Sequence, residues 1–406
     1  MDLLDGAARS YAWGSRTALA ALRGRPTPSP HPEAELWFGA HPGDPATLRS
    51  ETGDASLLDV VDSDPVGQLG SATVDKYGAR LPFLLKLLAA EEPLSLQAHP
   101  SSAQAAEGFA RENATGVAVD SSVRNYKDSS HKPELVIALT RFDALAGFRD
   151  PKRTLELFDH LAVPELAPYS EMLAAQPDSS GLRALFTSWI TLPQRALDVV
   201  LPSVLEGCVV ALGSGPGDFV PELRTVLELG EFYPGDGGVL AALLLNRITL
   251  EPGQGLYLAA GNLHAYLRGT AVEIMANSDN VLRGGLTPKH VDVPELLRVL
   301  DFEPLDAPVL DPEGERGTPV VYPTPAPEFT IARVDLTSSD TGITTAVAGS
   351  TGPRIVLVTE GDVDLVAGGR TLTVHRGGAA WLSATDPDPV VTTASETARL
   401  FVATVG

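Results

Sequence analysis

The stretch Leu94-Ser-Leu-Gln-Ala-His-Pro100 alternates strictly between apolar and polar residues. This alternation predicts a β-strand with its apolar side chains on one face and Ser95, Gln97 and His99 on the other. An amide and an imidazole would then point the same way from one strand. Both groups can bind a divalent metal ion, so further ligands are expected on strands that lie beside this one.

Strand-like runs occur on both sides of this stretch. Residues 81–88 are a compact apolar run typical of a buried strand, and residues 247–260 contain two short strands joined by the turn Glu251-Pro-Gly-Gln254. His264 and Tyr266 follow two positions apart, so we expect them on one face of a strand. Near the start of the chain, residues 10–22 predict a helix.

Two changes of pattern divide the chain. Apolar residues recur at helical spacing between residues 151 and 244, and a proline-rich stretch at 303–328 precedes several short strands with glycine-containing turns. Such short strands are typical of a sandwich or jelly roll. We therefore predict a mainly β fold with a helical insertion, divided into a discontinuous barrel (1–150 and 245–317), a helical domain (151–244) and a C-terminal barrel (318–406).

The charge of the chain limits its partners. Its 52 acidic and 30 basic residues leave a net charge of −22 at pH 7, and such a surface repels nucleic acid and anionic membranes. We therefore expect no nucleic acid and no membrane as partner. Apart from the charge, we expect a small-molecule ligand and a monomer or weak homo-oligomer. Lysine is scarce: the chain has six, of which Lys86, Lys132 and Lys289 return below as site candidates.

The single cysteine and the first residues favour a cytoplasmic location. Cys208 lies in an apolar stretch and cannot form an internal disulfide, so we interpret it as a buried structural thiol. The segment Met1-Asp-Leu-Leu-Asp-Gly lacks the basic start and apolar core of a signal peptide. No run approaches the roughly 18 consecutive apolar residues that span a bilayer.

The eight histidines form no local metal motif. No pair has His-Glu-x-x-His spacing, so a metal site would have to be assembled from distant strands, as a barrel allows. Three places offer suitable ligands: Gln97-Ala-His99, His131-Lys-Pro-Glu134, and His264-Ala-Tyr266 with Glu273 nine residues after His264. The alternative is that His99 and His264 are hydrogen-bonded core residues and that residues 131–134 form a solvated loop.

Five segments resemble the type I mannose-6-phosphate isomerases in order and approximate spacing. They are Tyr11-Ala-Trp-Gly14, Leu96-Gln-Ala-His-Pro100, His131-Lys-Pro-Glu134, Gly261-Asn-Leu-His-Ala-Tyr266 and Asn277-Ser-Asp-Asn-Val-Leu-Arg-Gly-Gly-Leu-Thr-Pro-Lys289. The last is the most specific, and the match covers residues 10–300. The resemblance implies a cupin-type fold for both barrels and an enzyme that interconverts mannose 6-phosphate and fructose 6-phosphate, which would serve mannose metabolism.

The resemblance also implies the residues of the site. One zinc ion per chain would be held by Gln97, His99, Glu134 and His264. The catalytic candidates are Arg283, Lys132 and Glu273. The residues expected to line the substrate pocket are Trp13, Lys86, Ser95, Tyr266, Asp279 and Lys289. In one place the chain departs from the family: many relatives read His-Pro-Asp-Lys where this chain reads His99-Pro-Ser-Ser102, so a charge pair is missing at the rim.

The chemistry of aldose–ketose isomerisation explains why such groups are needed. A proton moves between C1 and C2, and the negative charge that develops on oxygen must be stabilised by a metal or a guanidinium such as Arg283. Glu273 or Lys132 would move the proton, and burial would raise the pKa of a glutamate in this role. Alternatively, Glu273 is the outer partner of a zinc-bound histidine.

Several of these residues also have a plain structural interpretation. Without the resemblance, we would interpret Lys86 as a lysine that reaches the surface from a strand edge. Trp13 and Tyr266 would be interpreted as aromatic residues of the core. The C-terminal barrel contributes only His375, so we expect it to be metal-free and to serve packing. Two other functions are considered: a non-catalytic sugar-phosphate-binding cupin, and an iron-dependent cupin oxygenase, which the amide of Gln97 argues against.

Overall fold

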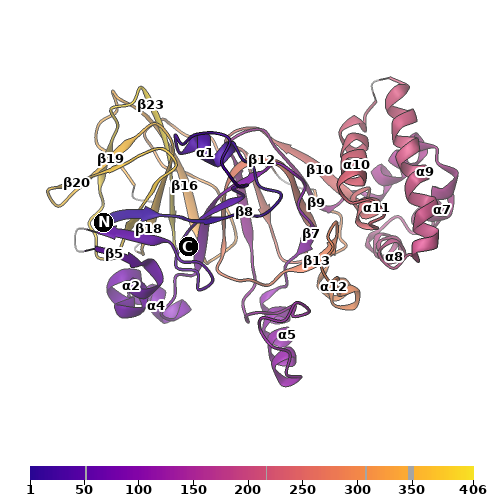
Figure 1. Ribbon diagram of the computed structural model, residues 1–406, viewed down its shortest axis with the longest axis horizontal. Helices are drawn as coiled ribbons and strands as arrows, with labels where there is room; N and C mark the ends of the chain where they lie inside the picture. The colour runs from indigo at the N-terminus through magenta and orange to yellow at the C-terminus, as the bar shows by residue number, and fades with distance from the viewer. Residues whose placement is uncertain (51–52, 216, 307–308, 346–351) are drawn as a thin grey trace.

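The computed structural model of the chain describes residues 1–50, 53–215, 217–306, 309–345 and 352–406. It arranges three parts in a row: helices at one end, C-terminal strands at the other, and between them the sheet that contains β8 and β12 (Figure 1). The mainly β fold with a helical part agrees with the sequence prediction. The domain boundaries at 151, 245 and 318 stay a prediction.

The central sheet has 11 strands, and its main path runs β14-β11-β8-β12-β6-β3-β2. Its strands are β2 (Ala7–Arg9), β3 (Glu35–Phe38), β6 (Phe83–Ala90), β7 (Leu96–Ala98), β8 (Glu134–Ala138), β9 (Phe142–Phe148), β10 (Leu245–Leu250), β11 (Gly255–Leu258), β12 (His264–Ala276), β13 (Leu282–Gly285) and β14 (Val309–Leu310). The long strand β12 pairs with β6, β8, β9 and β7, so it brings distant segments to one site.

Alternation along β6 separates a packing face from a polar face. Leu85 and Leu87 pack in a cluster with Ile355 and Phe401 of the C-terminal sheet, and all four are fully or almost fully buried. Lys86 lies between the two leucines and therefore points to the opposite face, into the interior of the central sheet. The run of apolar residues in β6 thus conceals one buried charge.

The second group of strands includes three from the start of the chain. An 8-stranded sheet runs β15-β16-β23-β18-β21-β1-β4-β5, and a 4-stranded sheet runs β17-β22-β19-β20. Their strands are β1 (Asp2–Asp5), β4 (Thr47–Ser50), β5 (Gly53–Ser56), β15 (Val320–Val321), β16 (Thr330–Thr337), β17 (Ile343–Thr344), β18 (Arg354–Glu360), β19 (Val363–Ala367), β20 (Arg370–Val374), β21 (Ala379–Leu382), β22 (Val390–Thr392) and β23 (Thr397–Thr404). The N-terminal segment therefore joins the C-terminal sheet through β1, which sequence analysis did not predict.

The helices flank the sheets. They are α1 (Ala18–Leu22), α2 (Leu57–Ser63), α3 (Pro65–Leu69), α4 (Ser71–Tyr77), α5 (Ser102–Ala114), α6 (Pro151–Leu161), α7 (Ala167–Ala175), α8 (Ser179–Ile190), α9 (Gln194–Gly213), α10 (Val220–Phe232), α11 (Gly238–Ala242) and α12 (Val293–Val299), with the 3₁₀ turn η1 (Pro164–Leu166). The expected helix at 10–22 is confirmed only as α1. Gly14 forms a β-bridge with Ala90, and Ser15 forms one with Glu33. Because these residues pair as in a strand, they cannot belong to the helix.

The helical part packs on the outer side of β7, β12 and β13. Leu96, Ala265 and Leu282 of these strands share one buried cluster with helix residues such as Trp189 and Cys208. Cys208 is buried and burial raises the pKa of its thiol to about 12, which confirms the interpretation as a structural thiol.

Helix α9 is long and apolar enough to cross a membrane by length and composition alone. Its side chains Leu197, Leu201 and Val204 are buried in the cluster just described. A core helix of a folded domain passes the same test of length and composition, and this packing fits that interpretation.

Candidate metal centre and substrate site

Three buried side chains converge in the interior of the central sheet. His99 Nε2 lies 3.3 Å from Glu134 Oε1, and His264 Nε2 lies 3.5 Å from Glu134 Oε2. The ligand atoms of the three residues all lie within 4.8 Å of one another, and the three side chains are 1–3% exposed. The structure thus brings together three of the four predicted metal ligands.

A β-bulge lets β12 contribute to the site at both ends. His264 and Glu273 are nine positions apart, so an uninterrupted strand would point them to opposite faces. The register of β12 against β9 shifts between Tyr266 and Arg268, and one extra residue restores a common face. The hydroxyl of Tyr266 then donates a hydrogen bond to Glu273 Oε1 over 2.9 Å.

The two histidines are held in one tautomer by backbone carbonyls. His99 Nδ1 lies 2.7 Å from the carbonyl oxygen of Asn280, and His264 Nδ1 lies 3.0 Å from that of Asn262. A carbonyl can only accept, so each Nδ1 carries the proton and each Nε2 presents a lone pair. Carbonyls hold metal-binding histidines in the same way in other proteins.

The donor set fits a metal ion. Both Nε2 atoms are buried and have no hydrogen-bond partner among the described residues, and they face the Glu134 carboxylate, which also offers only lone pairs. Burial lowers the pKa of His99 to about 4, so its imidazole is neutral at pH 7. Burial alone would raise the pKa of Glu134, but the ammonium of Lys132 keeps it well below its usual value. Converging lone pairs of this kind call for a cation between them.

Gln97 and Arg283 lie beside this cluster in strand register. On β7, Gln97 is opposite His264 of β12 on one side and opposite Arg283 of β13 on the other. Residues directly opposite in antiparallel strands share a face, with Cβ atoms about 5 Å apart. The amide of Gln97 therefore lies between His264 and Arg283 on this face, although the ligand role of Gln97 stays a prediction.

A second buried cluster centres on Lys86. Its ammonium donates to Glu273 Oε2 over 2.8 Å and lies 3.7 Å from Glu35 Oε1, while Glu35 Oε2 accepts from Trp37 Nε1 over 2.8 Å. Burial would lower the pKa of Lys86, but Glu273 and Glu35 raise it, so the lysine stays charged. The interpretation of Lys86 as a lysine that reaches the surface is wrong, because its side chain is only 7% exposed.

The pKa of Glu273 is raised, first by burial and then by Glu134 and Glu35, while Lys86 opposes the shift. This direction agrees with the expectation for a buried glutamate. The alternative role for Glu273, as outer partner of a zinc-bound histidine, does not fit: its carboxylate contacts Lys86 and Tyr266, and the histidines bond to carbonyls.

The remaining predicted residues lie around the metal cluster. Lys132 Nζ lies 3.0 Å from Glu134 Oε1. Asp279 is half-exposed and lies 3.3 Å from His41 Nε2, which keeps its pKa low. Trp13 packs against the interior cluster that contains Tyr266. Ser95 is half-buried just before β7, and its side chain has no hydrogen-bond partner among the residues described.

Two cations near the site have no acidic partner. In the described part of the chain, the side chains of Arg283 and Lys289 form neither hydrogen bonds nor ion pairs. Burial lowers the pKa of Arg283, and burial followed by the charges of Arg283 and Lys127 lowers that of Lys289. Unpaired cations gathered in a chain with a net charge of −22 favour an anionic ligand.

Sequence analysis missed three residues of this region. Glu35 and His41 lie in or next to an apolar run without any pattern that marks them, and only the pairing of β3 with β6 places Glu35 beside Lys86. Asn280 lies within the most specific quoted segment, so a signal for it was present.

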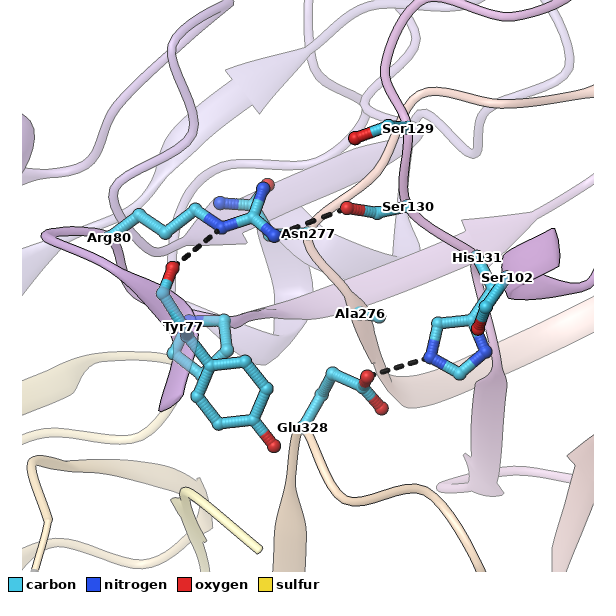
Figure 2. Close-up of a pocket in the computed structure, with 10 residues that line it drawn as sticks. Tyr77, Arg80, Ser102, Ser129, Ser130, His131, Ala276, Asn277 and Glu328 are labelled. Atoms are coloured by element: carbon cyan, nitrogen blue, oxygen red, sulfur yellow. Dashed lines mark hydrogen bonds and ion pairs between the residues drawn. The ribbon is translucent and has the colours of Figure 1, made fainter. Parts of the chain in front are cut away.

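A separate cavity of about 190 Å³ lies behind the segment that carries Lys132. Figure 2 shows Arg80 donating to Ser130, and His131 facing Glu328 across 2.7 Å, and none of the three clustered metal ligands lines it. Glu328 belongs to the segment that leads into β16. The cavity therefore lies between the loop before β8 and the segment that leads into β16.

The fold and the donor set define the chain as a metal-binding member of the cupin class. The sequence model "Phosphomannose isomerase type I, catalytic domain" matches residues 1–151. The chain is 39% identical over 405 residues to the mannose-6-phosphate isomerase of Escherichia coli (strain K12), covering 99% of both, and 32% identical over 413 residues to the human enzyme of the same name, covering 94% and 93%. A crystal structure of zinc-bound mannose 6-phosphate isomerase superposes with a TM-score of 0.88 at 35% identity, over 100% and 99% of the two chains. The chain belongs to the type I phosphomannose isomerase family.

Proposed function

We propose that the chain is a zinc-dependent isomerase that interconverts mannose 6-phosphate and fructose 6-phosphate. The observation that carries the proposal is the buried cluster of His99, Glu134 and His264, whose lone pairs converge near the guanidinium of Arg283, which has no partner among the described residues. Membership of the family supports the same reaction. A purely sugar-binding cupin would have no need of this metal cluster together with a free arginine.

His99, Glu134 and His264 would hold the zinc ion, and Gln97 would complete the set. Two imidazoles, a carboxylate and an amide oxygen suit a borderline divalent metal. Zinc held there would supply Lewis acidity toward the developing oxyanion, worth on the order of several kcal/mol. The carbonyls of Asn280 and Asn262 keep the two imidazoles in the binding tautomer.

Glu273 and Lys132 are the two candidates that move the proton between C1 and C2. Glu273 has a raised pKa and is held by Lys86 and Tyr266, so its carboxylate is fixed in position. Burial and Glu273 raise the pKa of the Tyr266 hydroxyl well above its usual value, so the phenol stays protonated and donates. Lys132 would need to be neutral to act as a base, yet it faces the Glu134 carboxylate at 3.0 Å. These contacts favour Glu273.

Arg283 and Lys289 would bind the negative charge of the substrate. Arg283 can donate two hydrogen bonds to the developing oxyanion or to the phosphate, and Lys289 offers a second unpaired cation. Lys86 is also expected to line the pocket, but its ammonium is occupied by Glu273 and Glu35 and is not free to bind the phosphate. We assign it to holding Glu273 in place. Trp13, Ser95, Tyr266 and Asp279 are proposed as walls of the sugar pocket.

The direct test is to add mannose 6-phosphate to the purified protein, with and without a chelator, and to measure fructose 6-phosphate. The proposal expects turnover that the chelator abolishes and that added Zn²⁺ restores. A saturable ligand with no product would instead identify a sugar-phosphate-binding protein. Elemental analysis separates a zinc enzyme from the iron-dependent oxygenase. We also propose a cytoplasmic monomer or weak homo-oligomer, with no nucleic acid or membrane partner; gel filtration tests its size.

A further inference from the structure

Asn280 is a fully buried amide whose side chain makes every hydrogen bond available to it. Its Oδ1 accepts from the backbone N–H groups of Lys127 (2.7 Å) and Asp128 (3.2 Å), and its Nδ2 donates to the carbonyls of Asp128 and Ser130, both over 2.8 Å. The residue is 0% exposed. An amide is the one side chain of this size with two donors and an acceptor that takes two bonds.

The side chain of Asp128 in turn accepts hydrogen bonds from the segment that carries Asn280. Its carboxylate accepts from the hydroxyl of Ser278 over 2.9 Å, from the backbone N–H of Asp279 over 2.9 Å and from that of Ser130 over 2.8 Å. Residues 127–130 and 278–280 are therefore tied by bonds in both directions. We refer to these two segments and the bonds between them as the Asn280–Asp128 clasp.

Both segments of the clasp lead directly into the site. Glu134 lies four residues after Ser130, with Lys132 between them, and Arg283 lies three residues after Asn280. The carbonyl oxygen of Asn280 also accepts from His99 Nδ1 over 2.7 Å. One buried residue thus connects a metal ligand to the backbone of the segments that carry Glu134 and Arg283.

We propose that Asn280 is a positioning residue that holds His99 in its metal-binding orientation and fixes the Arg283 and Glu134 segments relative to each other. The inference rests on the proposed function for its effect on turnover, but not for its effect on metal binding. Loss of the side chain would remove the partner of two backbone N–H groups and two carbonyls, so the segments would separate and the carbonyl facing His99 would shift. Carbonyl partners of metal-bound histidines change metal affinity on the order of 10- to 100-fold.

The test compares Asn280→Ala and Asn280→Asp with the matched control Asn277→Ala. Asn277 lies three residues earlier, and its side chain donates to the carbonyl oxygen of Leu81; among the described residues it forms no hydrogen bond to residues 127–130. Asn280→Asp keeps the shape but turns a carboxylate toward the carbonyls of Asp128 and Ser130. Zn²⁺ affinity is measured by competition with a chromophoric chelator, and ligand geometry by the absorption spectrum of the Co²⁺-loaded protein.

We expect both Asn280 variants to bind Zn²⁺ about 10- to 100-fold more weakly and to show an altered Co²⁺ spectrum, with kcat reduced more than KM changes. Asn277→Ala should stay within about twofold of the parent in Zn²⁺ affinity. Parent-like Zn²⁺ affinity and spectrum in Asn280→Ala would overturn the proposal, as would an equal loss in Asn277→Ala.

Asp128→Asn tests the same clasp if the Asn280 variants fail to fold. It leaves an amide where Ser278 and two backbone N–H groups donate, and we expect a smaller loss of Zn²⁺ affinity in the same direction. Unchanged Zn²⁺ affinity in this variant would contradict the proposal. If the parent protein did not isomerise mannose 6-phosphate, the proposed function would fail, whereas the metal-affinity results would still decide the role of Asn280.

Discussion

The interiors of the two barrels differ in chemistry far more than in architecture. The interior of the central sheet encloses Lys86, His99, Glu134, His264 and Glu273, all buried. The C-terminal strands gather a cluster of apolar residues, among them Val334, Val356, Leu400 and Val402, and Arg354 is the charged side chain buried among their described residues. His375, the one histidine there, is 76% exposed and lies 3.1 Å from Asp362.

A few buried polar side chains distinguish the two interiors, which share a framework of antiparallel strands. Antiparallel strands with alternating faces can fill an interior with valine and leucine or with a metal site. Burying charges is costly unless they are paired, and in the central sheet each buried charge has a partner or converges on a site for a cation. Substitutions in the interior of the central sheet should therefore reduce zinc binding and turnover, and substitutions in the C-terminal sheet should not.

The largest effect is expected from His264→Ala. Removal of one imidazole leaves the metal with too few ligands, so both zinc and activity should be lost, with kcat reduced on the order of 10³-fold or more. Elemental analysis and a coupled fructose 6-phosphate assay measure the two quantities. His160→Ala, on the exposed side of α6, is the control; full activity in a zinc-free His264→Ala protein would refute the metal assignment.

Arg283→Ala should separate turnover from metal binding. Arg283 has no partner in the described residues and is not among the proposed ligands, so zinc content should stay at one per chain while kcat falls about 10²- to 10³-fold. Arg268→Ala provides a control arginine, which is 59% exposed and paired with Glu228. We would withdraw the catalytic role of Arg283 if its alanine variant kept near-normal kcat.

Glu273→Gln should remove the acid limb of the pH–rate profile. A base must be deprotonated to act, and because the pKa of Glu273 is raised, activity should fall as the pH drops through a value above the usual range of a glutamate. The variant should lose about 10²-fold in kcat at neutral pH. An unchanged acid limb in Glu273→Gln would assign the proton transfer to Lys132 instead.

Removal of the metal should destabilise only the central sheet. A ligand present at 100 times its dissociation constant stabilises the folded state by about 2.7 kcal/mol, and a chelator removes this contribution. Hydrogen exchange should then increase in β7 and β8 and stay unchanged in β18 and β23. Equal loss of protection in both sheets would show that the barrels do not differ in the way described.

The smallest effect is expected from His375→Ala. The side chain is largely exposed, so zinc content should be unchanged and activity should stay within about twofold of the parent. A marked loss of zinc or of activity would reveal a role for the C-terminal sheet that its apolar interior does not suggest.

Much of the site could be predicted because its residue types and their resemblance to a family are local features of the sequence. His99, Glu134 and His264 each lie in a short recognisable segment, and the structure brings them together. The arrangement around them depends on pairing between distant strands. The bulge in β12, the contact of Glu35 with Lys86 and the addition of β1 to the C-terminal sheet arise from register, which short apolar runs do not specify.

The Asn280–Asp128 clasp illustrates the same limit. The segment that contains Asn280 was recognisable, but its partner segment, residues 127–130, is polar and irregular, and no periodicity connects the two. Their reciprocal hydrogen bonds exist only once β8 and β13 have been placed in the sheet. Sequence therefore identified the groups that perform the chemistry more readily than those that position them.

The metal centre can be located by anomalous X-ray scattering at the zinc edge, from crystals of the purified protein. We predict a single site per chain, at about 2.0–2.2 Å from His99 Nε2, His264 Nε2 and a Glu134 oxygen, with the Gln97 amide as a further ligand. An active protein with no zinc peak between these side chains, or with its only peak elsewhere, would contradict the account.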